Sequence, residues 1–355
     1  MPDQVVVTVV ELKILFNLAH HAGKQIFNVQ SLLPKAQIFQ GAIGARCKIA
    51  LMFDREYKQA WREIPPDIQT EIPRPEDERE LLLQAGILLP TNWESILEAV
   101  NRAQNAIGYK GGRLTYLAFD TVSLRNRLFS VLCERIPWRE RDRVACAVTP
   151  KIREELDFVG KYNGQSLKKL AGLQPAGRRI VDNFWNQPPL EQRQKRLGMI
   201  DLQKIRRGQY REAPNVEASD PDGQILDSLE KLAEKYDIIF LTSDGECTSR
   251  VVLRENIQGV HVVLPPMRDL SHKAEASWEE FATLLYLSAV RFGAVELSFG
   301  GDRRYELYGI WRGKQAESWE REDVAVQGQA VILTEFRTEI DLLRAGMTEE
   351  VTASA

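Results

Sequence analysis

Short apolar segments alternate with helix-like segments between residues 113 and 265, and this alternation most constrains the fold. The strand candidates read "LTYLAF", "RVACAVTP", "DIIFLTSD" and "GVHVVLP". Between them, "SLRNRLFSVLCERI", "KIREELDFVGKY" and "DGQILDSLEKLAEKY" are typical of helices. This alternation predicts an α/β fold with a parallel sheet flanked by helices.

The 355 residues exceed one ordinary hydrophobic core, and we expect three regions. Residues 1–110 predict a mixed but mostly helical N-terminal region of unknown role. Residues 111–265 predict the α/β domain, interrupted by a basic helical insertion at about 161–216. Residues 266–355 predict a small, separate α+β unit, with a helix "SWEEFATLLYLSAVRFG" and a hairpin across Gly300-Gly301-Asp302.

Composition excludes several classes of protein. With 44% hydrophobic and 27% charged residues the chain is expected to fold, and no apolar run is long enough to cross a bilayer. The N-terminus lacks the basic segment of a secretory signal. The cysteines form no CxxC pair, which favours a protein of the reducing cytoplasm. The histidines form no HExxH motif, so the ligands of any metal site are expected to be carboxylates. The cysteines are Cys47, Cys133, Cys146 and Cys247.

The net charge of −3 hides an asymmetry. Residues 111–215 carry 21 Lys and Arg against 11 Asp and Glu. Such a basic stretch is typical of a surface that binds a polyanion, and equally of a solvated helical surface. The aromatic residues in it could stack on unpaired bases or belong to the core; these are Tyr162, Phe184, Trp185 and Tyr210.

Four acidic positions are expected at one edge of the predicted sheet. Asp120 follows the first strand and Asp244 follows the strand "IIFLT", while Asp222 and the pair Glu154/Glu155 lie near helix starts. Strand carboxyl ends and the starts of the following helices share an edge in a parallel sheet. Clustered carboxylates favour a hard cation, so the pattern predicts Mg²⁺ or Mn²⁺ and metal-assisted phosphodiester hydrolysis.

Each acid also has a purely structural interpretation. Asp222 could cap a helix, Glu154 and Glu155 could favour a helix dipole, and Asp244 could be a turn residue. Asp120 could be a strand-to-loop residue. The ordered set is therefore more informative than any one position.

In their order along the chain, "LAFDT", "IREEL", "DGQIL" and "IIFLTSD" resemble the motifs of the PIN-domain nucleases. The resemblance covers about residues 113–265, under half of the chain. It implies that Asp120, Glu155, Asp222 and Asp244 hold one or two Mg²⁺ or Mn²⁺ ions. It also implies that Thr121 orients Asp120 or a water molecule.

The chain departs from the PIN pattern in two places. The family often has Asn after the Asp-Thr pair, where this chain has Val122 and Ser123. The basic stretch 161–216 is longer than a minimal PIN domain allows, and it leaves the acid at the third position open. Other acids that could join or replace a ligand are Asp220, Asp227 and Glu246.

The resemblance implies a metal-dependent endoribonuclease that cuts single-stranded RNA. The alternative is a non-catalytic nucleic-acid-binding or assembly protein on a PIN-like scaffold. A haloacid-dehalogenase-type phosphatase would need a second acid where Val122 stands, and a receiver-type domain would need paired acids on its first strand. The terminal regions could position substrate, mediate self-association or bind a protein partner.

Overall fold

A computed structural model describes residues 4–105, 113–136, 144–157, 164–173, 175–184, 190–266, 273–311 and 317–353. The chain divides into two compact units, each assembled from separate stretches of sequence. The antiparallel unit consists of Met1–Ile87, Tyr162–Arg193 and Leu270–Ala355, and the parallel unit consists of Leu88–Lys161 and Gln194–Asp269. The predicted α/β class is confirmed, and an antiparallel sheet is present beside the parallel one.

The parallel unit is built on five strands in the order β7-β6-β5-β8-β9, all parallel where they pair. Their bounds are β5 (Thr115–Phe119), β6 (Cys146–Val148), β7 (Tyr210–Glu212), β8 (Asp237–Thr242) and β9 (Ile257–His261). The central strands β5 and β8 are almost wholly buried, which explains why they are continuous apolar runs rather than alternating ones. Only β7 lies outside the strands that the sequence predicts.

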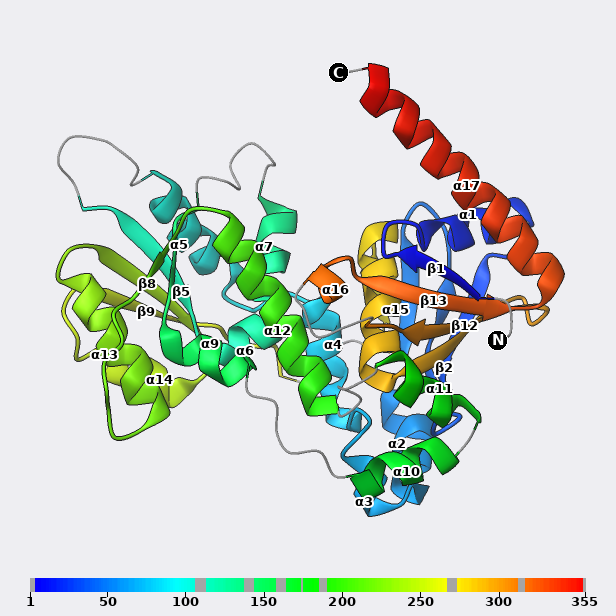
Figure 1. Ribbon diagram of the computed structural model, residues 1–355, viewed down its shortest axis with the longest axis horizontal. Coiled ribbons are helices and arrows are strands. Elements are labelled where there is room, and N and C mark those ends of the chain that lie inside the picture. The colour runs from blue at the N-terminus through cyan, green and yellow to red at the C-terminus, as the bar shows by residue number, and fades with distance from the viewer. Residues whose placement is uncertain are drawn as a thin grey trace. The chain divides into compact units, whose positions relative to one another are not determined.

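Helices flank this sheet, and α5, α13 and α14 pack directly against its strands (Figure 1). The helices that belong wholly to this unit are α5 (Trp93–Asn105), α6 (Thr121–Arg125), α7 (Leu128–Arg135), α9 (Pro150–Asp157), α13 (Pro221–Ala233) and α14 (Gly245–Val251). The long helix α12 (Leu190–Arg207) begins in the antiparallel unit and continues in the parallel one. The predicted helices at Asp222 and at Glu154/Glu155 are therefore present as α13 and α9, and α14 follows β8 where the sequence predicts no helix.

The antiparallel unit contains an eight-stranded sheet in the order β1-β13-β12-β11-β2-β3-β4-β10. The strands of the N-terminal stretch are β1 (Gln4–Thr8), β2 (Ile26–Ser31), β3 (Gln37–Ala42) and β4 (Cys47–Leu51). Those of the C-terminal stretch are β10 (Lys273–Ala276), β11 (Ala294–Phe299), β12 (Arg303–Gly309) and β13 (Asp323–Gly328). The predicted hairpin is confirmed, because β11 and β12 pair across Gly300 and Gly301, both at positive φ.

Helix α15 (Trp278–Phe292) packs on this sheet, and it is buried from Phe281 to its last residue (Figure 1). Ser277 and Glu280 form a reciprocal capping box at its start. The other elements are α1 (Lys13–His21), a π-helix (Phe53–Tyr57), α2 (Lys58–Glu63), α3 (Pro66–Gln69), a 3₁₀ turn (Pro75–Asp77), α4 (Glu78–Gln84), α10 (Gly164–Leu173), α11 (Pro175–Asn183), α16 (Glu317–Glu320) and α17 (Ala330–Ala353).

The structure groups the chain differently from the three consecutive regions that the sequence predicts. Residues 1–110 contain more helix than strand, but their four strands contribute half of the antiparallel sheet. The strands of 266–355 complete that sheet instead of forming a separate unit. The cause is strand pairing: β1 pairs with β13 and β2 with β11, contacts that join residues about 300 positions apart.

The basic stretch 161–216 is shared between the two units. Most of its described part is helical, as predicted, but α10 and α11 belong to the antiparallel unit. The end of α12 and the strand β7 belong to the parallel unit. Helix α5, which the sequence places in the first region, packs against β5 and β8.

Candidate functional site

The strand order of the parallel sheet creates a switch point between β5 and β8. The chain fills the β7 side of β5 first and then returns to the β8 side, so the connections after β5 and β8 run in opposite directions. Ligands in open parallel sheets bind beyond the carboxyl ends of the strands at such a point. Asp120 directly follows β5, and Asp244 lies two residues beyond β8.

Asp120 is nearly buried, at 6% exposure, and both oxygens of its carboxylate accept hydrogen bonds. Oδ1 accepts from the amide of Ser123 and thereby caps α6. Oδ2 accepts from Thr242 Oγ1 at 2.5 Å and from the amide of Ser243 at 3.0 Å. Burial raises the pKa of Asp120 above the usual range of an aspartate, and these hydrogen bonds act in the opposite direction.

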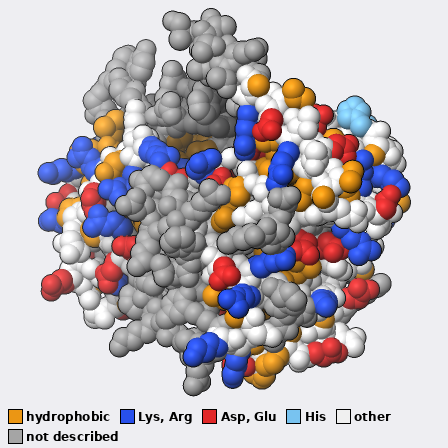
Figure 2. Space-filling model, turned by 45° about the vertical axis from the view of Figure 1, so that its right-hand side comes forward, with side chains coloured by type: hydrophobic (Ala, Val, Ile, Leu, Met, Phe, Trp, Pro, Cys, Tyr) orange, Lys and Arg blue, Asp and Glu red, His pale blue; other side chains and the backbone are white. Residues whose placement is uncertain are grey.

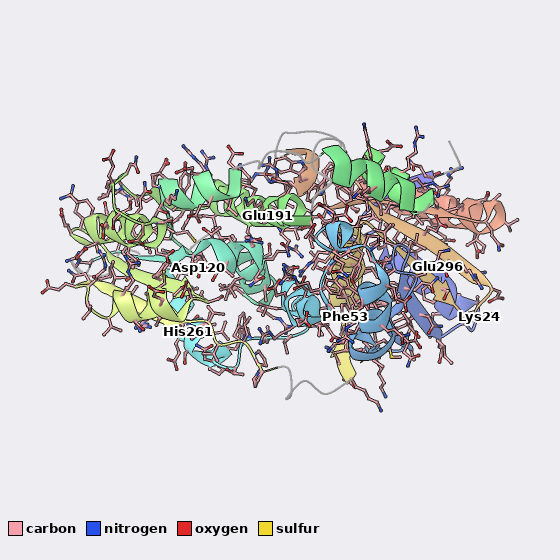
Figure 3. All side chains as sticks on the ribbon, turned by 90° about the horizontal axis from the view of Figure 1, so that it is seen from below. Lys24, Phe53, Asp120, Glu191, His261 and Glu296 are labelled. Carbon is pink, nitrogen blue, oxygen red and sulfur yellow. The ribbon has the colours of Figure 1, made fainter. Side chains whose placement is uncertain are left out.

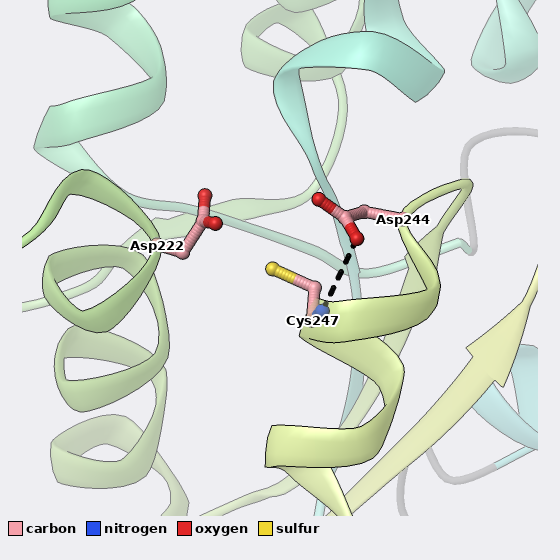
Figure 4. Close-up of side chains that lie close together, drawn as sticks. All are labelled: Asp222, Asp244 and Cys247. Atoms are coloured by element: carbon pink, nitrogen blue, oxygen red, sulfur yellow. Dashed lines mark hydrogen bonds between the residues drawn. The ribbon is translucent and has the colours of Figure 1, made fainter.

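The side chains of Asp222, Asp244 and Cys247 lie close together. One ligand atom from each of these three residues lies within 4.8 Å of the other two (Figure 4). Asp222 comes from the first turn of α13 and is partly buried, while Asp244 is exposed and caps α14 by accepting from the amides of Glu246 and Cys247. The two carboxylates therefore stand on two neighbouring helix starts.

The Cys247 thiol lies within the negative field of three of the four predicted acids. Burial and the charges of Asp222, Asp244 and Asp120 raise the pKa of this thiol to about 12. Cys247 is 2% exposed and sits in the first turn of α14. Asp222, Asp244 and Asp120 are thus each near enough to the Cys247 sulfur atom to raise the pKa of its thiol.

The fourth predicted acid, Glu155 on α9, is linked to the same edge through a different residue. Thr121 donates a hydrogen bond from Oγ1 to Glu155 Oε2 at 2.5 Å. The resemblance implies that Thr121 orients Asp120 or a water molecule, whereas in the structure its hydroxyl orients Glu155. Neither Glu155 nor Asp120 belongs to the group of close ligand atoms formed by Asp222, Asp244 and Cys247 in the described residues.

Two of the three possible substitute acids are held by arginines. Arg250 binds both carboxylate oxygens of Asp220, at 2.8 and 3.2 Å, and Asp220 also caps α13. Arg254 pairs with Asp227 and Glu230 further along the same helix. These pairs neutralise both candidates and leave Asp222 as the ligand that α13 offers.

The third substitute, Glu246, has an exposed side chain and is outside the close group of the described residues. Cys247, in contrast, is a residue that the sequence does not single out, because it belongs to no cysteine pair of ligand spacing. A usable signal exists: Cys247 follows Asp244 by three residues, which places both on the first turn of one helix.

The donor set suits a hard divalent cation in part. The carboxylates of Asp222 and Asp244 offer the oxygen ligands that Mg²⁺ and Mn²⁺ prefer. An ionised carboxylate has about four lone-pair sites, and Asp120 already accepts from two amides, from the Thr242 hydroxyl and from the Ser123 side chain, so it can bind an ion only by giving up one of these hydrogen bonds. The Cys247 thiol, with its raised pKa, remains protonated near neutral pH and is a poor ligand for these ions.

Two cationic, two acidic and two amide side chains line a cleft on the helices that also carry Glu155 and Asp222. It has a volume of about 320 Å³ and lies against α9, α13 and the segment that precedes α13. Its lining residues are Pro150, Lys151, Arg153, Glu154, Asp157, Asn215 and Gln224. The cleft shares α9 with Glu155 and α13 with Asp222.

The basic stretch contributes less free positive charge than its composition suggests. Arg193 is buried and donates to the backbone carbonyls of Glu71, Val290 and Arg291, and the buried Arg196 pairs with Asp157. Figure 2 shows a face on which acidic and basic side chains are interspersed. The exposed cations at the end of α12 and on β7 are Arg206, Arg207 and Arg211.

The aromatic residues of this stretch divide between core and surface. Phe184 is 1% exposed and packs against Trp311, so it belongs to the core. Tyr210 is 40% exposed beneath the guanidinium of Arg206. It begins β7, whereas the acids lie at the carboxyl ends of the strands. Tyr162 and Trp185 lie outside the described residues.

His261 is a further polar residue at the carboxyl edge. It ends β9 opposite Thr242, and its Nδ1 lies 3.1 Å from Thr248 Oγ1. Figure 3 labels His261 in the same part of the molecule as Asp120. Thr248 donates to the carbonyl oxygen of Asp244, which ties His261 to the start of α14. The sequence does not single out His261, because it belongs to no ligand motif.

No helix in the described part of the chain is long and apolar enough to cross a bilayer. Comparisons of the chain with models of protein families, with curated proteins and with solved structures gave no match.

Proposed function

We propose that the protein is a metal-dependent nuclease that hydrolyses phosphodiester bonds, with single-stranded RNA as its substrate. The observation that carries the proposal is the approach of Asp222 and Asp244 to within 4.8 Å in front of Cys247, at the switch point where Asp120 ends β5. Mutual repulsion makes such a pair costly without a cation, because like charges at short range destabilise the ionised state.

The chain's own residues would divide the work as follows. Asp222 and Asp244 would hold Mg²⁺ or Mn²⁺, and Asp120 would join them by giving up one of its hydrogen bonds to the protein. Glu155, oriented by Thr121, would hold an attacking water or a second ion. The ion, when bound, would neutralise charge on the phosphate and lower the pKa of water.

The cleft beside α9 and α13 supports nucleic acid as the substrate. Lys151 and Arg153 could contact phosphates, and the amides of Asn215 and Gln224 could hydrogen-bond to base edges. Single strands expose those edges, whereas a duplex hides them in base pairs. RNA rather than DNA follows only from the resemblance to PIN-domain nucleases.

A labelled single-stranded RNA tests the proposal. We expect cleavage with Mg²⁺ or Mn²⁺, none with EDTA, and loss of cleavage in Asp120→Asn, Asp222→Asn and Asp244→Asn. Binding of the RNA by Asp120→Asn should be retained or strengthened. Cleavage that survives EDTA, or that all three variants retain, would overturn the proposal.

A non-catalytic nucleic-acid-binding or assembly protein is the second candidate. The observation that favours it is that two of the acids also have structural roles, since Asp120 caps α6 and Asp244 caps α14. This candidate predicts that the wild-type chain binds RNA without cutting it in either metal.

A further inference from the structure

Two helix starts carry the carboxylates of the candidate metal site, and one arginine connects them. Asp222 is on α13 and Asp244 is the cap of α14. Arg250, on α14, forms two hydrogen bonds to Asp220, the cap of α13. The guanidinium therefore links the helix that bears Asp244 to the residue that sets the start of the helix that bears Asp222.

The contact between Arg250 and Asp220 is bidentate. A guanidinium that binds both oxygens of a carboxylate restricts orientation as well as distance, unlike a single-point ammonium contact. Asp220 Oδ1 also accepts from the amide of Gly223 at 2.7 Å, so the same carboxylate holds both the arginine and the first turn of α13. A Cβ at Gly223 would lie 3.0 Å from Arg250 Nη2, and glycine leaves that space open.

We propose that Arg250 is a positioning residue that sets the separation of Asp222 and Asp244 by clamping Asp220, and so tunes the affinity of the site for a divalent cation. This inference rests on the proposed function of the acids. Arg250 does not itself offer a ligand, and its effect passes through the start of α13.

Arg254 provides a matched control. It lies three residues beyond the end of α14 and pairs with Asp227 and Glu230, which lie in the middle and last part of α13. Substitution of Arg254 removes the same charge and a similar ion-pair link to α13 without touching the helix starts. A general loosening of the helix pair would affect both arginines equally.

Positioning and simple electrostatics predict opposite effects of Arg250→Gln on metal affinity and the same effect of Asp220→Ser. On charge alone, Arg250→Gln removes a cation near the site and should tighten Mn²⁺ binding, whereas Asp220→Ser removes an anion and should weaken it. If the clamp positions Asp222, both substitutions weaken binding, even though serine can still cap α13. Removal of such supporting groups typically lowers metal affinity by about tenfold or more.

The test is Mn²⁺ titration of the full chain without RNA, followed by calorimetry. We expect about tenfold weaker binding for Arg250→Gln and for Asp220→Ser, and a double variant no weaker than either single one by more than about twofold. Arg250→Lys should recover only part of the affinity, and Arg254→Gln should bind like wild type. Tighter or unchanged binding in Arg250→Gln would overturn the inference.

Hydrogen exchange provides a second measurement that does not depend on the metal. The amides of Gly223 and Gln224 bond to Asp220, so Arg250→Gln should speed their exchange while Arg254→Gln leaves it unchanged. If the wild-type protein binds no Mn²⁺, the proposed function fails. Hydrogen exchange then still tests whether Arg250 holds the start of α13. Equal exchange in the two variants would overturn this role of Arg250.

Discussion

Thr242 Oγ1 donates a 2.5 Å hydrogen bond to Asp120 Oδ2, and this contact joins the carboxyl ends of β5 and β8. The same Thr242 oxygen accepts from the amide of Asp244 at 3.0 Å. A single hydroxyl thus connects the buried acid that follows β5 with the exposed acid that follows β8. It explains how a charge is tolerated at the end of an apolar strand.

Thr242→Val should destabilise the protein. The change preserves shape but leaves the buried Asp120 carboxylate and the Asp244 amide each without this partner, a loss of about 1–3 kcal/mol. Urea unfolding measures it. Thr242→Ser, which keeps the hydroxyl, should retain most of the stability, and equal losses in the two variants would contradict this role for the hydroxyl.

Asp201 should make stability fall as the pH rises. Its fully buried carboxylate accepts from the amide and hydroxyl of Ser130, and burial raises its pKa despite the nearby charges of Lys204 and Arg127. A raised carboxyl pKa favours the folded state below the unfolded pKa of about 3.9, and this contribution is lost as pH rises through the folded pKa. Relative to Asp201→Asn, wild type should therefore lose stability between acidic and neutral pH in urea titrations.

Glu11 should show the opposite slope. Burial would raise its pKa, but Arg344 and Thr8 outweigh burial and lower it. Its contribution to stability is present above the unfolded pKa and is lost as pH falls through the folded one. Compared with Glu11→Gln, the wild-type protein should lose stability on acidification. If stability changed with pH in the same direction for Asp201 and Glu11, one of the two assignments would be wrong.

Substitution of a cleft cation, as in Lys151→Gln or Arg153→Gln, should lower the affinity for RNA. It should also make that affinity depend less steeply on salt concentration. Removal of one phosphate-binding cation should lower the slope of log affinity against log salt by about one. Fluorescence anisotropy with an EDTA-treated sample measures binding without cleavage. Lys231→Gln is the control, because Lys231 is an exposed cation of α13 that pairs with Glu234 outside the cleft.

Cys247→Ala should leave RNA cleavage largely intact. The thiol has a raised pKa and is therefore not available as a thiolate ligand near neutral pH. The substitution removes one buried sulfur atom and should cost on the order of 1 kcal/mol in unfolding free energy. A loss of cleavage as complete as in Asp222→Asn would show that the sulfur takes part in the site.

The sequence by itself determined the class of the parallel sheet and placed acids after β5, after β8 and at the start of α13. Continuous apolar strands and the caps that follow them are local features, because burial on both faces and the first turn of a helix depend on near neighbours in the chain. For that reason β5, β8 and the positions of Asp120, Asp222 and Asp244 could be predicted from short segments.

Only the tertiary structure decided which stretches of the chain form each unit. It also decided which of the acids at the start of α13 is bound by Arg250. The antiparallel sheet joins strands about 300 positions apart, and no local pattern specifies such pairing. Asp220 and Asp222 look equivalent in sequence, but Arg250 reaches only Asp220 in a bidentate contact. Which acid Arg250 contacts depends on how α14 packs against its neighbours. The same packing brings Cys247 close to Asp222 and Asp244.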